Sequence, residues 1–167
     1  MARKFKATEI RLDAVKERNE AYTSYLMFHE SDGLRLTGMA SIPNGRGPFP
    51  VVLLNHGYAH PSRYTTGAGT RVMSDILASR GYLTLASDYR GLGQSEDNTS
   101  INLGIRLEFA VDVLNLAAAV PSLPEAQTQP IGIWGHSLGG ELALRAAAVD
   151  RNIGPVAVWA PMSPWID

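Results

Sequence analysis

The sequence contains no cysteine among its 167 residues. Disulfide bonds, thiolate nucleophiles and cysteine-ligated zinc sites are therefore excluded. It also has no excess of charge of one sign, since 15 Lys and Arg residues stand against 16 Asp and Glu residues. Proteins that bind nucleic acid or anionic membranes through general electrostatics usually carry a basic excess, so we expect neither kind of partner.

Long hydrophobic runs are missing as well. No apolar stretch approaches the roughly 18 residues that a membrane-spanning helix needs. The basic residues 1–6 are not followed by the apolar segment of a secretory signal peptide, so we expect a cytoplasmic protein. No two of the four histidines stand four residues apart on a predicted helix, as a helical zinc site requires, and we expect neither a metal nor another cofactor.

The sequence does contain charged and amphipathic segments that outline a domain. Residues 1–22 are charge-rich and mixed in sign, and we interpret them as a short helix or a loose lead-in to a domain that spans residues 23–167. Two short segments follow, Tyr22–Glu30 and Leu34–Ile42. The Asp-Gly pair between them predicts an antiparallel hairpin.

Four apolar runs come next, and they are typical of strands that are buried on both faces of a parallel sheet. Helical segments separate them at residues 70–80, 101–120 and 138–149. This alternation predicts an α/β protein with a mostly parallel sheet, preceded by the antiparallel strand pair. The runs are Phe49–Asn55, Tyr82–Ser87, Ile131–Trp134 and Pro155–Ala160.

A G-x-S-x-G motif, formed by Gly135, Ser137 and Gly139, follows the third apolar run. An Ala- and Leu-rich helix comes after it, which completes the strand–turn–helix setting of a nucleophile elbow. In such an elbow the glycines avoid collisions, and the serine adopts a strained backbone conformation. The helix N-terminus also presents free N–H groups and a positive dipole end to a developing oxyanion. The motif therefore predicts Ser137 as a nucleophile.

A second motif, His56-Gly57-Tyr58, stands at the end of the first apolar run. Its position matches the loop that supplies an oxyanion donor in hydrolases with such an elbow. We expect the backbone N–H groups of Tyr58 and Leu138 to form the oxyanion hole. His56 is interpreted as shaping this loop and not as the base. We expect His136 to be buried in the elbow and to point away from the working face of the serine.

A third motif begins at Asp88 and continues as Tyr89-Arg90-Gly-x-Gly-x-Ser. As a dinucleotide-binding fingerprint it is incomplete, because Glu96 stands where the third glycine is needed. We interpret the motif as a glycine-rich bend after a strand. In this bend Asp88 and Arg90 hold the loop by hydrogen bonds and charge.

In their order along the chain, the three motifs resemble the α/β-hydrolase family, most closely its dienelactone-hydrolase and prolyl-oligopeptidase-like branches. The resemblance runs from about Tyr25 to Trp165. It implies the α/β-hydrolase fold and a serine hydrolase that forms an acyl-enzyme on Ser137. The family's triad continues to an acid and a histidine on later loops, but no histidine follows His136 here. Asp167, the last residue, is a poor candidate for the acid, so the resemblance implies a domain truncated after its sixth strand.

The missing base leaves several hypotheses open, because serine is a poor nucleophile without one. We favour an enzyme or enzyme fragment that acts on small carboxylic esters, or on amides. The alternatives are a serine peptidase of the prolyl-oligopeptidase-like type, a non-catalytic binding module, and a subunit that another chain complements. The apolar strand Val156–Ala160 would have an uncovered edge, which favours a complementing chain or self-association.

Overall fold

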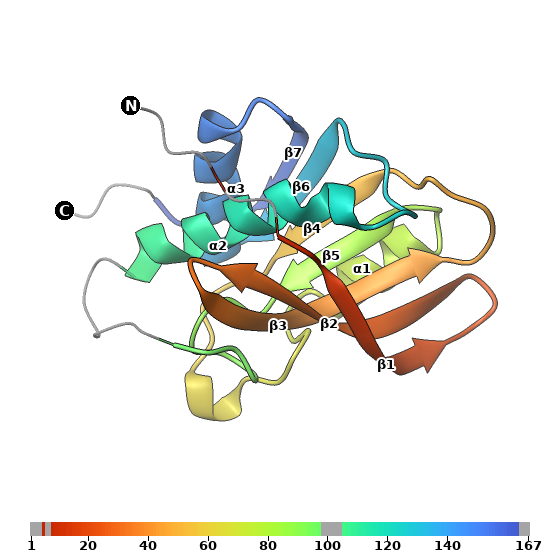
Figure 1. The fold of residues 1–167 in the computed structure, drawn as a ribbon. Coiled ribbons are helices and arrows are strands. Elements are labelled where there is room, and N and C mark those ends of the chain that lie inside the picture. The colour runs from red at the N-terminus through yellow and green to blue at the C-terminus, as the bar shows by residue number, and fades with distance from the viewer. Residues whose placement is uncertain (1–4, 6–7, 98–104, 164–167) are drawn as a thin grey trace.

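The structure, a computed structural model, describes residues 5, 8–97 and 105–163. Its centre is a mixed sheet of seven strands in the order β1-β2-β3-β5-β4-β6-β7 (Figure 1). The strands are β1 (Arg11–Arg18), β2 (Tyr22–Ser31), β3 (Leu34–Pro43), β4 (Val51–Asn55), β5 (Leu83–Ser87), β6 (Ile131–His136) and β7 (Ile153–Trp159). The helices are α1 (Arg71–Ala78), α2 (Ile105–Ala119) and α3 (Leu138–Val149), with short 3-10 helices η1 (Pro61–Arg63) and η2 (Val120–Ser122).

The sheet confirms the predicted α/β fold with leading antiparallel strands. β2 and β3 form the hairpin, and both residues of its Asp32-Gly33 turn have positive φ angles, of 52° and 82°, as a tight hairpin turn requires. β3 pairs antiparallel with β5, while β5, β4, β6 and β7 run parallel to one another. The first four residues of the helix expected at 101–120 lie outside the described part.

The charged N-terminal segment differs from the expectation of a helix or loose lead-in. Residues 11–18 form β1, which pairs antiparallel with β2 at the edge of the sheet. The pairing is interrupted by register shifts on either side of Val15. Charged side chains and irregular pairing both protect an edge strand from joining other chains, so a charge-rich sequence is compatible with a strand in this position.

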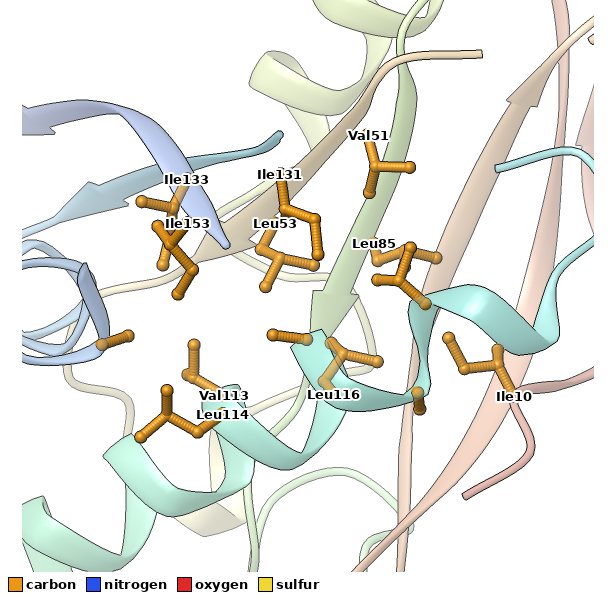
Figure 2. Close-up of a cluster of buried hydrophobic side chains, with 14 of the residues drawn as sticks. Ile10, Val51, Leu53, Leu85, Val113, Leu114, Leu116, Ile131, Ile133 and Ile153 are labelled. Carbon is orange, nitrogen blue, oxygen red and sulfur yellow. The ribbon is translucent and has the colours of Figure 1, made fainter. Parts of the chain in front are cut away.

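The hydrophobic core lies between one face of the sheet and helices α2 and α3. Strand side chains such as Leu53 and Ile133 point toward Val113 and Leu116 of α2 (Figure 2). Because the side chains of a strand alternate between faces, their sequence neighbours lie on the opposite side of the sheet, which α1 covers. Helices α2 and α3 therefore form one layer, and α1 belongs to the other (Figure 1).

The layer under α1 is held by hydroxyl groups in addition to apolar contacts. Ser24 and Ser41 are hydrogen-bonded at 2.6 Å, and Ser74 of α1 donates to Ser41 at 2.9 Å. Ser74 is also 2.7 Å from the hydroxyl of Thr84 on β5. All four residues are buried, so this chain of mutual hydrogen bonds compensates for their loss of hydration.

β7 is the outer strand of the sheet on the side opposite to β1, as expected from its position. Val156, Val158 and Trp159 are 39%, 37% and 69% exposed. The sequence of β7 carries no charged residue that would discourage pairing with another strand. In the described residues this edge is therefore an apolar surface.

Protonation of His29 on β2 is expected to make the stability depend on pH. Its ring is buried, its Nε2 is 3.1 Å from the Ser87 hydroxyl, and its Nδ1 has no partner among the described residues. Loss of hydration lowers the pKa of His29 from 6.5 to about 4. Between these values the unfolded chain binds a proton that the folded chain does not, so stability falls as the pH falls.

We predict that the free energy of unfolding attributable to His29 drops by about 3 kcal/mol between pH 7 and pH 4. Urea denaturation at several pH values measures it. His29→Gln should flatten this dependence, while His60→Gln at an exposed loop position serves as the control. An unchanged pH dependence in His29→Gln would contradict the assignment.

Candidate active site

Ser137 occupies the tight turn between β6 and α3. Its φ of 53° and ψ of −119° form a strained combination that residues with a side chain rarely adopt. Its N–H donates to the carbonyl oxygen of Trp159 at 3.0 Å, and its own carbonyl accepts from the N–H of Met162 and of Gly140, each at 3.0 Å. The strained turn is therefore fixed by the end of β7 on one side and by α3 on the other.

The two motif glycines stand where backbone segments meet. A Cβ atom on Gly135 would overlap the carbonyl group of Gly139, and one on Gly139 would overlap the carbonyl oxygen of Asn55. Both obstacles are main-chain atoms, which cannot turn away as a side chain can. The first turn of α3 can therefore pack this closely against β4 and β6 only because these positions lack side chains.

The His56-Gly57-Tyr58 loop leaves β4 directly beside this turn. A Cβ atom built on Gly57 would lie 3.3 Å from Cβ of Ser137 and 3.3 Å from Nδ1 of His136. Leu138 is the first residue of α3, where a helix has no internal acceptor for the N–H group. The structure thus brings together the serine, the loop before Tyr58 and the start of α3.

The expectation that His136 is buried was wrong. The residue is half-buried, and its ring lies against Gly57. Along β6 the buried positions Ile131, Ile133 and Gly135 alternate with half-buried ones, and His136 is one of the half-buried residues. Its place in the motif therefore puts it on the opposite face of the sheet from α3.

The ring of His56 is held within its own loop. It is buried, with the rings of Tyr64 and Tyr89 at centroid distances of 4.8 and 4.3 Å. Its Nδ1 is 2.6 Å from the carbonyl oxygen of Gly57, and its Nε2 is 3.4 Å from that of Asp88. Loss of hydration lowers the pKa of His56, so the ring is neutral near pH 7 and serves as a loop anchor in this geometry.

The other histidines are also engaged away from the serine. His60 is exposed, and its Nδ1 lies 2.9 Å from the hydroxyl of Ser62. His29 lies on β2, with its Nε2 3.1 Å from the hydroxyl of Ser87. Across residues 8–97 and 105–163, none of these rings is hydrogen-bonded to Ser137, and Asp167 lies outside the described residues.

The third motif supplies two separate anchors at the end of β5. Arg90 forms a buried ion pair with Asp112 of α2, with Nη2 and Oδ1 2.6 Å apart. The carboxylate of Asp88 accepts hydrogen bonds from the loop after β4. The sequence did not identify Asp112 or Tyr64 as partners. An aspartate in the middle of the apolar helix α2 was the available signal for a buried ion pair.

In the part of the chain that the structure describes, no group of three or more His, Asp or Glu residues is arranged to hold a metal ion. No helix built from the described residues is long and apolar enough to cross a membrane. A cavity of about 360 Å³ lies at the start of α1, where Ser41, Thr66 and Arg71 help to line it, and none of its lining residues belongs to the elbow.

The fold and the elbow define an α/β-hydrolase, and the comparisons with known proteins agree. The family model described as Serine aminopeptidase, S33 matches residues 47–167, and the chain belongs to this family. The chain is 31% identical over 133 residues to the esterase EstD of Thermotoga maritima, and 35% identical over 112 residues to the lysophosphatidylserine lipase ABHD12 of Danio rerio. Acetyl xylan esterase 1 from Thermoanaerobacterium has the same fold, with a TM-score of 0.75 at 22% identity.

The chain corresponds to only part of these proteins. The matches cover 77% and 65% of this chain but 31% and 26% of the esterase and the lipase. The structural match covers 94% of this chain and 54% of the acetyl xylan esterase chain. The relatives therefore contain long segments that have no counterpart in these 167 residues.

We predict that Gly139→Ala destabilises the fold by about 1–3 kcal/mol or more, because its methyl group meets the backbone of β4. Thermal or urea unfolding measures the effect. The control is Gly132→Ala on β6, where the nearest atom to a built Cβ is a methyl of Val52 at 3.3 Å. Equal losses of stability in the two variants would show that the elbow is not unusually crowded.

Proposed function

We propose that Ser137 is the nucleophile of a serine hydrolase that cleaves carboxylic esters through an acyl-enzyme. The observation that carries the proposal is the strained turn at Ser137, closed by backbone hydrogen bonds and placed against the loop at Gly57. The chain belongs to a hydrolase family and is similar to a named esterase, and both findings support the same reaction class.

The proposed reaction has two stages. The Ser137 hydroxyl attacks the ester carbonyl, and the backbone N–H groups of Tyr58 and Leu138 stabilise the oxyanion that forms. Loss of the alcohol leaves an acyl group on Ser137, and water then releases the carboxylic acid. The side chain of Tyr58 is 74% exposed, so it can contribute to substrate contacts outside the oxyanion hole.

The base and the acid are proposed to come from polypeptide outside the described residues. His56 and His60 are engaged within the loop that carries them, so neither is placed to take the serine proton. We propose that this polypeptide docks at the edge of β7. The end of this strand lies next to the serine, since the carbonyl oxygen of Trp159 accepts a hydrogen bond from the N–H of Ser137. A further segment of the same protein or a complementing chain would satisfy the proposal equally.

We favour esters over peptides as substrates because the relatives named above are an esterase and a lipase. The family description, which names an aminopeptidase, keeps peptides as the second substrate class. A binding module without catalysis is the remaining alternative. The reactivity of Ser137 toward a covalent probe distinguishes a hydrolase from a binding module, because a nucleophile elbow makes its serine more reactive than the other serines.

We predict slow labelling of the 167-residue chain by a fluorophosphonate, lost in Ser137→Ala and kept in the control Ser79→Ala at an exposed helix end. Mass spectrometry of the labelled peptide measures it. The same three proteins should hydrolyse a short p-nitrophenyl ester at rates within about tenfold of one another, because without a base most of a triad's contribution is lost.

Each readout has its own contrary outcome. Equal labelling of the chain and Ser137→Ala would reject Ser137 as the nucleophile, and absence of labelling would favour the binding module. Ester turnover that depends on Ser137 would place the base within these 167 residues. Faster cleavage of a p-nitroanilide than of the ester would favour the peptidase.

A further inference from the structure

Asp88, immediately after β5, is a point where several chain segments meet. Its side chain is fully buried. Oδ1 accepts hydrogen bonds from the hydroxyl of Tyr64 at 2.8 Å and from the N–H of Gly67 at 3.1 Å. Oδ2 accepts from the hydroxyls of Thr37 at 2.6 Å and Thr66 at 2.7 Å. A buried carboxylate is costly unless its oxygens are hydrogen-bonded, and here both oxygens are.

Three of these four donors lie in residues 56–67, the segment that begins with the oxyanion loop. Tyr64 also contacts the ring of His56, whose Nδ1 is 2.6 Å from the carbonyl oxygen of Gly57. The fourth donor, Thr37, lies on β3 in the interior of the sheet. The contacts therefore run without interruption from the sheet through Asp88 and Tyr64 to Gly57, beside Ser137.

The segment between these anchors has little packing of its own. The 3-10 helix η1 contains no buried residue, and the positions around it, from Tyr58 to Arg63, are mostly exposed. Ordering backbone costs about 1–2 kcal/mol per residue, so an exposed segment needs attachments at its ends. Gly57 against the elbow provides one attachment, and the hydrogen bonds to Asp88 provide the other.

We propose that Asp88 is a positioning residue that holds the backbone N–H groups of the oxyanion loop in place through Tyr64 and His56. An oxyanion hole stabilises charge only when its donors are already oriented, so the order of this loop affects the reactivity of the serine. The proposal rests on the proposed function for its effect on Ser137, but its effect on the loop is independent of catalysis.

The hydrogen-bond chemistry separates two substitutions. In Asp88→Asn one oxygen still accepts from Tyr64 and Gly67, and the hydroxyls of Thr37 and Thr66 can turn to accept from the new amide. Asp88→Ala instead leaves the N–H of Gly67 and three hydroxyls without their acceptor, which is the costly case for buried donors. The conservative variant should therefore rescue the loop.

We predict that Asp88→Ala raises hydrogen exchange of the backbone amides in residues 56–67 at least tenfold, while Asp88→Asn stays within about threefold of the unaltered chain. Fluorophosphonate labelling of Ser137 should slow at least tenfold in Asp88→Ala only. Mass spectrometry measures both quantities. The matched control is Asp112→Ala, which removes an equally buried carboxylate from Arg90 and should destabilise the chain without selective exchange in residues 56–67.

Unchanged exchange of this segment in Asp88→Ala would overturn the proposal. Selective exchange with unchanged labelling of Ser137 would overturn the link to the oxyanion hole. If the unaltered chain is not labelled at all, the proposed function fails, and the exchange measurement still decides whether Asp88 holds the loop. If Asp88→Ala does not fold, Tyr64→Phe removes one donor and keeps the ring against His56, and exchange at Gly57 and Tyr58 should then rise severalfold; no rise there would overturn the proposal.

Discussion

The close approach of three backbone segments at the elbow is the constraint on which the rest of the site depends. β4, β6 and the first turn of α3 meet where Gly135 and Gly139 have no room for a Cβ atom. This contact brings the start of α3 beneath Ser137 and the loop at Gly57 beside it. Because the obstacles are main-chain atoms, the arrangement cannot relax by side-chain rotation, and the strained backbone of Ser137 is preserved by its surroundings.

Buried polar groups at the end of β5 extend this order to the neighbouring loops. Asp88 holds the loop after β4, and Arg90 holds α2 through Asp112. A buried ion pair adds little net stability, but loss of one partner leaves an uncompensated charge. Two charged residues of one motif, Asp88 and Arg90, therefore fix different elements: the loop beside Ser137 and the core helix α2. The side chains of Asp88 and Arg90 therefore define the role of this bend more than its glycines do.

Local signals predicted most of the fold and the elbow. The Asp32-Gly33 hairpin, the four parallel strands and the turn at Ser137 each depend on residues close in sequence. Other features were missed, among them the ion pair of Asp112 with Arg90, which depends on a tertiary contact. The charged segment around Val15 becomes a strand only by pairing with β2. The exposure of His136 follows from the face of β6 on which it lies, and the partnership of Tyr64 with Asp88 joins residues 24 positions apart.

The edge strand β7 supports the turn at Ser137 and also forms an outer edge of the sheet. Its last residue, Trp159, accepts the N–H of Ser137, and Met162 just beyond it donates to the carbonyl of the same serine. The outer side of β7 exposes apolar residues such as Val156 and Val158. A strand added to this edge would restrain the residues that hold the serine turn.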